Sequence, residues 1–328
     1  MNWKLIGHQW AAHLLQRHLL NESLRHAYLF CGPEGIGRRT MALRLTQSLF
    51  CTSTERTDVP CLHCKSCQQV ERMEHPDFYP INVSSDSQVI KIDQIRELHH
   101  SLSLSPYQAP YQVALLQDFE KATHSAQNAL LKTLEEPPPQ VLIILTAENP
   151  EMLLETIVSR CEVVNLRTVP LGIIQRELID EYNLESDNAL KLAHLSAGRP
   201  GAAVRLHQQP ELRAKHQQWL DELQALLPAS IVERFSQAKN LKSDAEQFID
   251  IIDIWLSYWR DVLLAQTGAN SPLINIDRRD EISEISKKVS LNEIKEMINN
   301  LEEAREQLTN YANTQLTIEN LFLQLPTL

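Results

Sequence analysis

A glycine-rich segment at residues 32–40, GPEGIGRRT, has the pattern of a phosphate-binding loop. An apolar run at residues 27–31 precedes it, and apolar residues at helical spacing follow it up to residue 50. A strand, a loop and a helix are therefore predicted in that order. Such a loop binds phosphate through bare backbone N–H groups and the N-terminus of the helix. Gly32, Gly35 and Gly37 would allow the backbone to take this shape.

The side chains that would contact the phosphate and bind the metal differ from the consensus of such loops. The consensus places Lys after the last glycine and then Ser or Thr, whose hydroxyl binds Mg²⁺. Here Arg38 and Arg39 occupy those positions. Arg38 is a broad planar cation and not a compact point charge, and Arg39 has no hydroxyl. Thr40 has one, but it lies one residue further along the helix, turned by about 100°. The pattern predicts a nucleotide site that has lost its metal and cannot use ATP productively; an ordinary strand-to-helix turn is the alternative.

Four cysteines follow with the spacing C-x9-C-x2-C-x2-C, namely Cys51, Cys61, Cys64 and Cys67. Thiols at this spacing suit a tetrahedral structural Zn²⁺ site in a chain from a reducing compartment. The polar insert between the first two cysteines cannot form its own core, which a bound metal would compensate. His63 is a spare ligand, and unrelated free thiols are the alternative. Four thiolates leave no open coordination position, so the predicted zinc is structural and not catalytic.

A second polar stretch, Gln117 and Asp118, ends the apolar run at residues 113–116. ATPases of the phosphate-binding-loop class place a metal-binding Asp at the end of such a strand, commonly followed by a Glu that activates water. If Gln117 takes the first position, the metal-binding Asp is missing. If Asp118 takes it, Phe119 stands where the Glu is needed. Either register lacks one carboxylate, and a plain core strand remains the alternative.

Strands and helices alternate from residue 27 to residue 166, which predicts a parallel sheet covered on both faces. The strands are expected at 27–31, 77–83, 113–116, 141–146 and 162–166, and single helices at 10–20, 92–102, 125–136 and 150–159. His8, His13 and His18 along the first helix are expected to be solvated. Beyond residue 167 only helices are predicted, at 171–182, 187–196, 201–207, 211–227, 231–240, 244–266, 282–289, 291–308 and 313–323, with a loop at 268–277. An aromatic stripe around Trp255 and Trp259 indicates core packing, with a subunit contact as the alternative.

Composition and charge exclude several classes of protein. The net charge of −11 argues against a free-standing nucleic-acid binder, which carries a basic face. No apolar run approaches the length of a membrane span, and the first residues do not have the pattern of a secretion signal. We therefore expect a cytoplasmic protein with no membrane partner, in which paired cysteines bind metal and do not form disulfides.

Five motifs in this order resemble the clamp loader subunits of bacterial DNA polymerase III, which belong to the AAA+ ATPases. They are GPEGIGRRT, the cysteine insert, HPDFYPI, NALLKTLEEPP and the tripeptide SRC at residues 159–161. The resemblance implies a parallel α/β domain of the AAA+ phosphate-binding-loop type at residues 1–166, with its zinc module at 51–67. It also implies a helical lid at 167–208 and an all-α collar at 209–328 that joins five subunits.

A degraded nucleotide site beside an intact SRC is the pattern of the delta-prime branch of this family. Active members also aim an arginine from the lid at the γ-phosphate; Gly201 stands at the matching position here, although Arg199 lies nearby. The resemblance therefore implies a subunit of the polymerase (nucleotidyltransferase) holoenzyme that does not hydrolyse ATP. It would assist ATP-driven loading of the sliding clamp onto primed DNA, with delta and tau/gamma subunits as partners in a hetero-pentamer.

Arg160 is the residue that the resemblance assigns to catalysis. In this family the SRC arginine enters the ATP site of the neighbouring subunit as an arginine finger, worth about 10³–10⁵ in rate in the best cases. The alternative is an ordinary surface ion pair, worth about 0–1 kcal/mol. For the whole chain, the alternatives are an active ATPase of the tau/gamma type and a zinc-ribbon module that binds nucleic acid.

Overall fold

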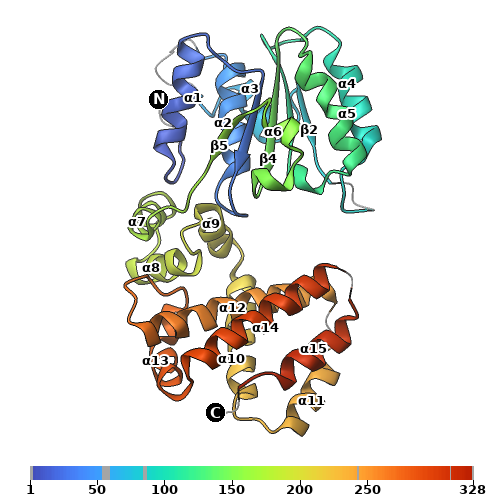
Figure 1. Cartoon of the computed structure of the whole chain (residues 1–328). Helices are drawn as coiled ribbons and strands as arrows, with labels where there is room; N and C mark the ends of the chain where they lie inside the picture. The colour runs from blue at the N-terminus through green and yellow to red at the C-terminus, as the bar shows by residue number, and fades with distance from the viewer. Residues whose placement is uncertain (1–2, 54–59, 84–86, 242–243, 311, 327–328) are drawn as a thin grey trace. The chain divides into compact units, whose positions relative to one another are not determined.

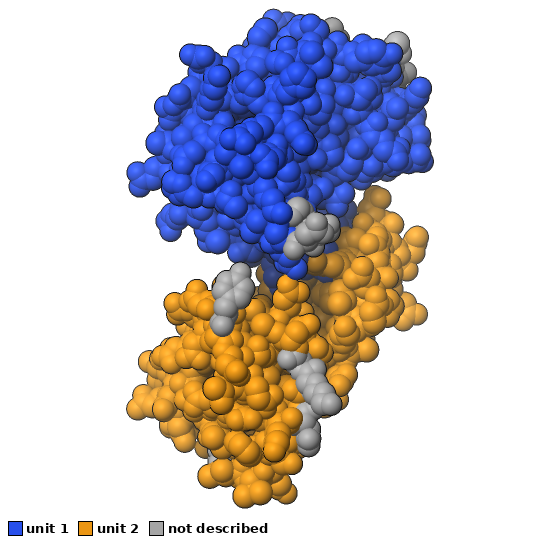
Figure 2. All heavy atoms as spheres, turned by 90° about the vertical axis from the view of Figure 1, so that its right-hand side faces the viewer, with its two compact units in different colours: residues 1–177, 198–202 blue, residues 178–197, 203–328 orange. Residues whose placement is uncertain are grey.

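The computed structural model describes residues 3–53, 60–83, 87–241, 244–310 and 312–326 (Figure 1). The chain forms two compact units, shown in two colours in Figure 2. Unit 1 contains residues 1–177 and 198–202, and unit 2 contains residues 178–197 and 203–328. The two units share the segment 167–208 between them, and the division into three domains at residues 166 and 208 stays a prediction.

Unit 1 is built on a five-stranded sheet, which confirms the predicted parallel α/β arrangement. The strand order is β2-β3-β4-β1-β5, and every pair is parallel. The strands are β1 (Ala27–Cys31), β2 (Phe78–Ile81), β3 (Gln112–Leu116), β4 (Val141–Ala147) and β5 (Glu162–Asn165). Every residue of β1, β3 and β4 is buried, because helices cover both faces of a parallel sheet.

Six helices cover the two faces of this sheet (Figure 1). The first face packs against α1 (Gln9–Leu20), α2 (Arg38–Phe50) and α3 (Lys65–Glu71). The second packs against α4 (Ile92–Leu102), α5 (His124–Glu135) and α6 (Glu155–Val158). Successive residues of a strand point to opposite faces, so Tyr28 and Phe30 enter the first core while Ala27 and Leu29 enter the second. Because β1 and β3 both run parallel to β4, the segments that follow them leave the same edge of the sheet.

Two helical segments of unit 1 differ from the prediction. Residues 150–159 do not form one helix: a 3₁₀ turn, η3 (Pro150–Met152), is followed by extended Leu153 and then by the short α6. The break buries Leu153 and lets the amide of Leu154 donate to Oε1 of Gln127 at 3.1 Å. In the cysteine insert, α3 was not predicted, and residues 54–59 of that insert lie outside the described residues.

The described residues of unit 2 form helices joined by loops, with no strand among them, as predicted. It begins within α7 (Leu171–Tyr182) and includes most of α9 (Pro200–Gln208). The other elements are α8 (Ser186–Leu195), α10 (Pro210–Leu226), α11 (Ile231–Asn240), α12 (Ala245–Thr267), η4 (Ile276–Arg278), α13 (Arg279–Lys288), α14 (Leu291–Thr309) and α15 (Thr314–Leu323). The α13 helix begins three residues before the predicted start at residue 282, and η4 lies in the predicted loop. Trp255 and Trp259 are buried, so their stripe belongs to the core.

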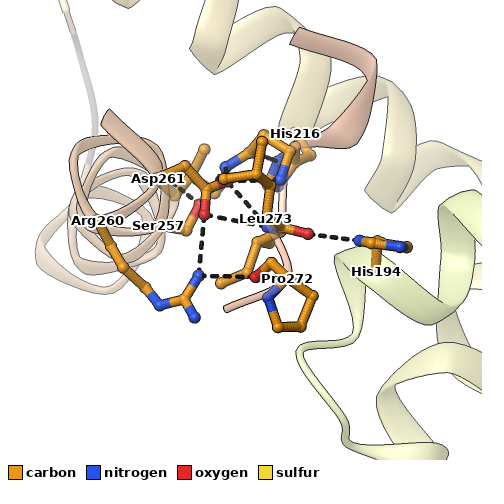
Figure 3. Close-up of polar contacts among 10 residues, drawn as sticks. His194, His216, Ser257, Arg260, Asp261, Pro272 and Leu273 are labelled. Carbon is orange, nitrogen blue, oxygen red and sulfur yellow. Dashed lines mark hydrogen bonds and ion pairs between the residues drawn. The ribbon is translucent and has the colours of Figure 1, made fainter. Parts of the chain in front are cut away.

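A fully buried carboxylate, Asp261 of α12, holds the loop between α12 and α13 (Figure 3). It accepts hydrogen bonds from the amides of Ile274 at 2.9 Å and Asn275 at 2.7 Å, and Nη1 of Arg260 lies 2.9 Å away. The side chain of Asn275 also donates to Asp261 and accepts from Nε2 of His216. The buried charge is thus fully partnered and secures the loop.

Among the helices that the structure describes, none is both long and apolar enough for a membrane span.

Candidate functional site

The glycine-rich loop connects β1 to α2 with the backbone shape that its glycines allow. Gly32, Gly35 and Gly37 have φ values of 145°, 78° and 113°, in a region that residues with a side chain rarely adopt. Gly37 is the residue immediately before α2, so the amides at the helix N-terminus lie next to the loop. The predicted strand, loop and helix are therefore present, and the three glycines adopt the left-handed backbone region that the prediction requires of them.

Arg38, at the position of the consensus lysine, is held inside unit 1 by two carboxylates. Its Nη2 lies 3.1 Å from Oδ1 of Asp118, and its Nη1 lies 3.8 Å from Oε1 of Glu120. The side chains of Arg38 and Glu120 are only 8% and 7% exposed, whereas that of Asp118 is 40% exposed. The cation that would meet a phosphate is thus neutralised by the protein's own acidic groups. We call these contacts the loop ion pairs.

The structure decides the register that the sequence left open. Asp118 is the residue that faces the loop, because its Oδ1 lies 3.1 Å from Nη2 of Arg38. Its backbone has a left-handed φ of 49°, and its amide donates to Oγ1 of Thr146 at 2.9 Å. Gln117 instead donates to Oδ1 of Asn82 at 2.6 Å. The second carboxylate, Glu120, was missed. It follows Asp118 in a 3₁₀ turn, η2 (Phe119–Lys121), which the sequence did not indicate.

Burial raises the pKa of Glu120 above its ordinary value, although the neighbouring Arg38 opposes this shift. A carboxyl group with a raised pKa is a weaker partner for a metal ion than an exposed carboxylate, because it must be deprotonated to bind. Of the remaining loop side chains, Arg39 is exposed and Thr40 is half-buried. Whether the loop binds nucleotide productively stays a prediction at this point.

Two backbone carbonyl groups of the loop form hydrogen bonds with neighbouring segments of unit 1. The carbonyl of Gly35 accepts hydrogen bonds from the amides of Gly201, at 2.8 Å, and Ala202, at 3.2 Å. A Cβ atom at Gly201 would lie 2.9 Å from this carbonyl, so an arginine there would require the segment to shift. The carbonyl of Ile36 lies 3.0 Å from Nε2 of His8. His8 is buried and not solvated as predicted.

The four predicted cysteine ligands form one cluster. The sulfur atoms of Cys51, Cys61, Cys64 and Cys67 all lie within 4.8 Å of one another, and those of Cys61 and Cys67 are 4.0 Å apart. Around a tetrahedral Zn²⁺ with Zn–S bonds of about 2.3 Å, sulfur atoms lie about 3.8 Å apart. The observed separations fit such an ion after a small contraction. The donor set, four thiols with no water or carboxylate position, suits a closed site.

Local structure positions these thiols for metal binding. Cys64 precedes α3 and its sulfur accepts from the amide of Cys67, while the sulfur of Cys61 accepts from the amide of Cys64. Burial alone would raise the pKa of Cys64, but hydrogen bonds, first from the Cys67 amide, bring it to about 6. Such bonds favour the thiolate of Cys64, whereas burial raises the pKa of Cys51 and of Cys67 above the ordinary value. The spare candidate, His63, is exposed and hydrogen-bonds to the carbonyl of Cys61.

Arg160 lies at the surface of unit 1, just after α6. Its Nη2 forms an ion pair with Oε1 of Glu135 at 2.8 Å, and its Nη1 donates to the carbonyl of Thr156 at 2.8 Å. The side chain is 35% exposed, so the guanidinium is not enclosed in the core. This geometry is compatible with a contact to another molecule. The loop and Arg160 belong to the same unit, but Arg38 of the loop and Arg160 form ion pairs with different carboxylates.

Two family comparisons cover most of the chain. Residues 7–170 match the family described as DNA polymerase III, delta subunit, and residues 210–327 match the family described as DNA polymerase III, delta subunit, C terminal. The two matches fall largely in unit 1 and unit 2, respectively.

Individual relatives agree with the family comparisons. The chain is 29% identical to the DNA polymerase III subunit delta' of Bacillus subtilis, over 95% of this chain and 94% of the relative. It is 28% identical to the subunit delta' of Escherichia coli, over 92% and 88% of the two chains. It is also 25% identical to the subunit tau of Bacillus subtilis, over 93% of this chain but only 57% of the relative.

Proposed function

This chain belongs to the DNA polymerase III delta subunit family, and we propose that it serves as a delta-prime type of clamp loader subunit that does not hydrolyse ATP itself. In this role it assists ATP-driven loading of the sliding clamp onto primed DNA and completes a neighbour's ATP site with Arg160. It acts in the cytoplasm within the polymerase holoenzyme, as a scaffold subunit of AAA+ type and not as an enzyme by itself.

The loop ion pairs are the observation that carries the first half of this proposal. A working site needs a compact lysine ammonium at the phosphates and a free carboxylate at the metal. Arg38 takes the place of the lysine and neutralises Asp118, the acidic residue two positions after the end of β3. For Mg·ATP to bind as in an active site, the ion pairs would have to break and the buried Glu120 would lose its partner. Such a rearrangement is costly because it leaves a buried charge uncompensated.

The exposure of Arg160 supports the second half. A guanidinium can stabilise the charge that develops on a transferring phosphoryl group even when it belongs to another subunit. Arg160 has this accessibility, and Glu135 and Thr156 hold it at the surface. An arginine enclosed in the core of unit 1 would have excluded a role in trans.

We further propose that the cysteine cluster binds one structural Zn²⁺. The sulfur separations and the closed set of four thiols support this assignment. The ion would secure the insert between α2 and α3, which has little apolar surface to bury, and would take no part in ATP chemistry.

The partners in this proposal are delta and tau/gamma subunits in a hetero-pentamer, and through them the clamp and primer–template DNA. One surface of unit 2 supports a subunit contact. The first two turns of α11 expose three apolar side chains, Ile231, Val232 and Phe235, which are 67%, 79% and 44% exposed. Clustered exposed apolar residues are typical of protein–protein interfaces. We assign this α11 face to the contact with a neighbouring clamp loader subunit.

Reconstitution with the delta and tau/gamma subunits of the same organism tests the proposal. The complex should hydrolyse ATP in response to clamp and primed DNA, and Arg160→Ala should lower this rate while leaving assembly intact. An unchanged rate would remove Arg160 from catalysis.

The isolated chain distinguishes the alternative functions. Tight Mg·ATP binding with turnover would favour an active ATPase of the tau/gamma type, which the similarity to tau keeps in consideration. Steeply salt-dependent DNA binding by the isolated chain would instead favour a nucleic-acid-binding module. We expect neither result, because of the loop ion pairs and the net charge of −11.

A further inference from the structure

We infer that Glu135 is a positioning residue for Arg160, and that this is the role of the acidic end of the NALLKTLEEPP motif. The inference rests on the proposed function of Arg160 in trans. The motif forms most of α5, and Glu135 is the last residue of that helix. Its Oε1 lies 2.8 Å from Nη2 of Arg160, from which it is separated by the whole of β4 and α6.

Helix α5 holds the segment that carries Arg160 at two points. Near its start, Oε1 of Gln127 accepts the amide of Leu154 at 3.1 Å; at its end, Glu135 pairs with Arg160. Eight residues separate Gln127 from Glu135, which is about 12 Å along a helix. Between these points, Leu130 and Leu134 of α5 share a core cluster with Ile157 of α6. The position of Arg160 is therefore set by its contacts with α5 and not by the segment after α6 alone.

The contacts of Arg160 leave it able to act on another molecule. A guanidinium has five N–H donors. Within the described part of the chain, Thr156 and Glu135 each take one at 2.8 Å, and Oγ of Ser159 lies at the long distance of 3.5 Å from Nη1. The other donors can meet phosphate oxygens while these two anchors remain. Arg160 thus does not have to leave Glu135 to reach a neighbour's γ-phosphate.

Glu135 contributes by reducing the number of conformations that Arg160 samples before the neighbour arrives. A long, 35% exposed arginine would otherwise occupy many rotamers. Placing a catalytic group in advance is a recognised source of rate enhancement, and small displacements are costly. Removing the carboxylate should therefore lower the rate of the chemical step and leave the binding of ATP by the neighbour unchanged.

The test uses the reconstituted complex with clamp and primed DNA, and measures the rapid phase of ATP hydrolysis and the KM for ATP. Glu135→Gln should slow the rapid phase by about three- to tenfold. This is more than the loss of an exposed ion pair would cause and less than the displacement of a catalytic group would cause. KM should stay the same, and Glu135→Asp should recover part of the rate. Glu136→Gln is the matched control, because it removes the same charge from the same motif, and it should have no effect.

A double-mutant cycle separates positioning from a general structural effect. In the Arg160→Ala background, Glu135→Gln should cause no further loss, because the two residues act as one unit. An additional loss of similar size would mean that Glu135 acts elsewhere, and would overturn the inference.

Three other results would also overturn it. The first is an unchanged rate in Glu135→Gln. The second is a faster rate in this variant, which would mean that the carboxylate restrains Arg160. The third is a variant that assembles poorly but whose assembled complexes hydrolyse ATP at the full rate. If Arg160→Ala slows hydrolysis in the same experiment while Glu135→Gln does not, the proposed function stands and only the positioning role fails. If neither substitution changes the rate, the proposed function itself fails.

Discussion

Replacing Arg38 with leucine should destabilise unit 1 and leave unit 2 unaffected. Leucine keeps an apolar side chain at this buried position but removes the only cation that the structure places beside Glu120 among the described residues. Asp118 is 40% exposed and can regain water when the arginine is lost. Glu120, with its side chain 7% exposed, cannot. The loss of stability therefore comes mainly from one buried carboxylate, that of Glu120, which is left without its cation.

Breaking a buried ion pair by removing one partner costs about 3–5 kcal/mol. Because Asp118 can be rehydrated, we expect the lower end of this range, about 3 kcal/mol at neutral pH. The loss should shrink as the pH falls. Burial already raises the pKa of Glu120, and Arg38 opposes that shift, so the pKa rises further without the arginine. A raised folded-state pKa gives stability that is present at low pH and lost as the pH rises through that pKa.

Peptide-resolved hydrogen exchange measures this effect in each unit separately. The amides of β1, β3 and β4 report on the opening of unit 1, and those of α12 and α14 report on unit 2 as an internal control. Global unfolding is a poorer measure, since a chain with two units need not unfold in one step. The opening free energy of the strands should fall by about 3 kcal/mol, while that of the two helices stays constant.

A second substitution tests whether charge is the cause. Adding Glu120→Gln to Arg38→Leu removes the uncompensated carboxylate and should restore most of the lost stability at neutral pH. Equal protection in wild type and Arg38→Leu would refute the buried ion pair as a stabilising feature. A loss that persists in the double variant would show that leucine fails on packing and not on charge.

Four further predictions concern other parts of the chain. Cys64→Ser should reduce the zinc content, measured by elemental analysis, from about one ion per chain to near zero and loosen the insert, because one of four ligands is lost. Arg234 is 1% exposed and donates to four carbonyl groups, those of the last residue of α10 and the residue after it and two in the segment after α15. Arg234→Met should lower the opening free energy of unit 2 by about 3 kcal/mol or more, since buried acceptors lose their donor. Val232→Asp should prevent assembly with partner subunits in gel filtration without changing the circular dichroism spectrum, because it puts a charge into an apolar contact. Burial lowers the pKa of His8 below its ordinary 6.5, so unit 1 should lose stability as the pH falls below 6.5, and His8→Asn should reduce this dependence in hydrogen exchange.

Each of these has a clear opposite outcome. Full zinc content in the cysteine variant would place the metal elsewhere. Unchanged protection of unit 2 in Arg234→Met would mean that water replaces the guanidinium at no cost. Normal assembly of Val232→Asp would remove the α11 face from the interface. An identical pH profile in His8→Asn would mean that other groups cause the dependence.

The fold class could be predicted because it depends on local patterns. Fully apolar runs such as residues 141–147 and alternating helices indicate a buried parallel sheet, since such strands have helices on both faces. The cysteine cluster was predicted for the same reason: its ligands lie within 17 residues, and spacing alone nearly determines how they meet. The break at Leu153 was not predicted, because it depends on a hydrogen bond to Gln127, which is distant in sequence.

The sequence by itself showed which side chains of the loop were altered, because the consensus is contiguous and each position can be compared in turn. Only the tertiary structure decided what Arg38 does, since its partners Asp118 and Glu120 lie 80 and 82 residues away and follow a different strand. The same holds for Glu135 and Arg160, which meet because a parallel sheet brings the ends of separate strand–helix units to common edges and surfaces. Local spacing determines elements and compact metal sites, whereas charge pairing between elements depends on the order of strands in the sheet.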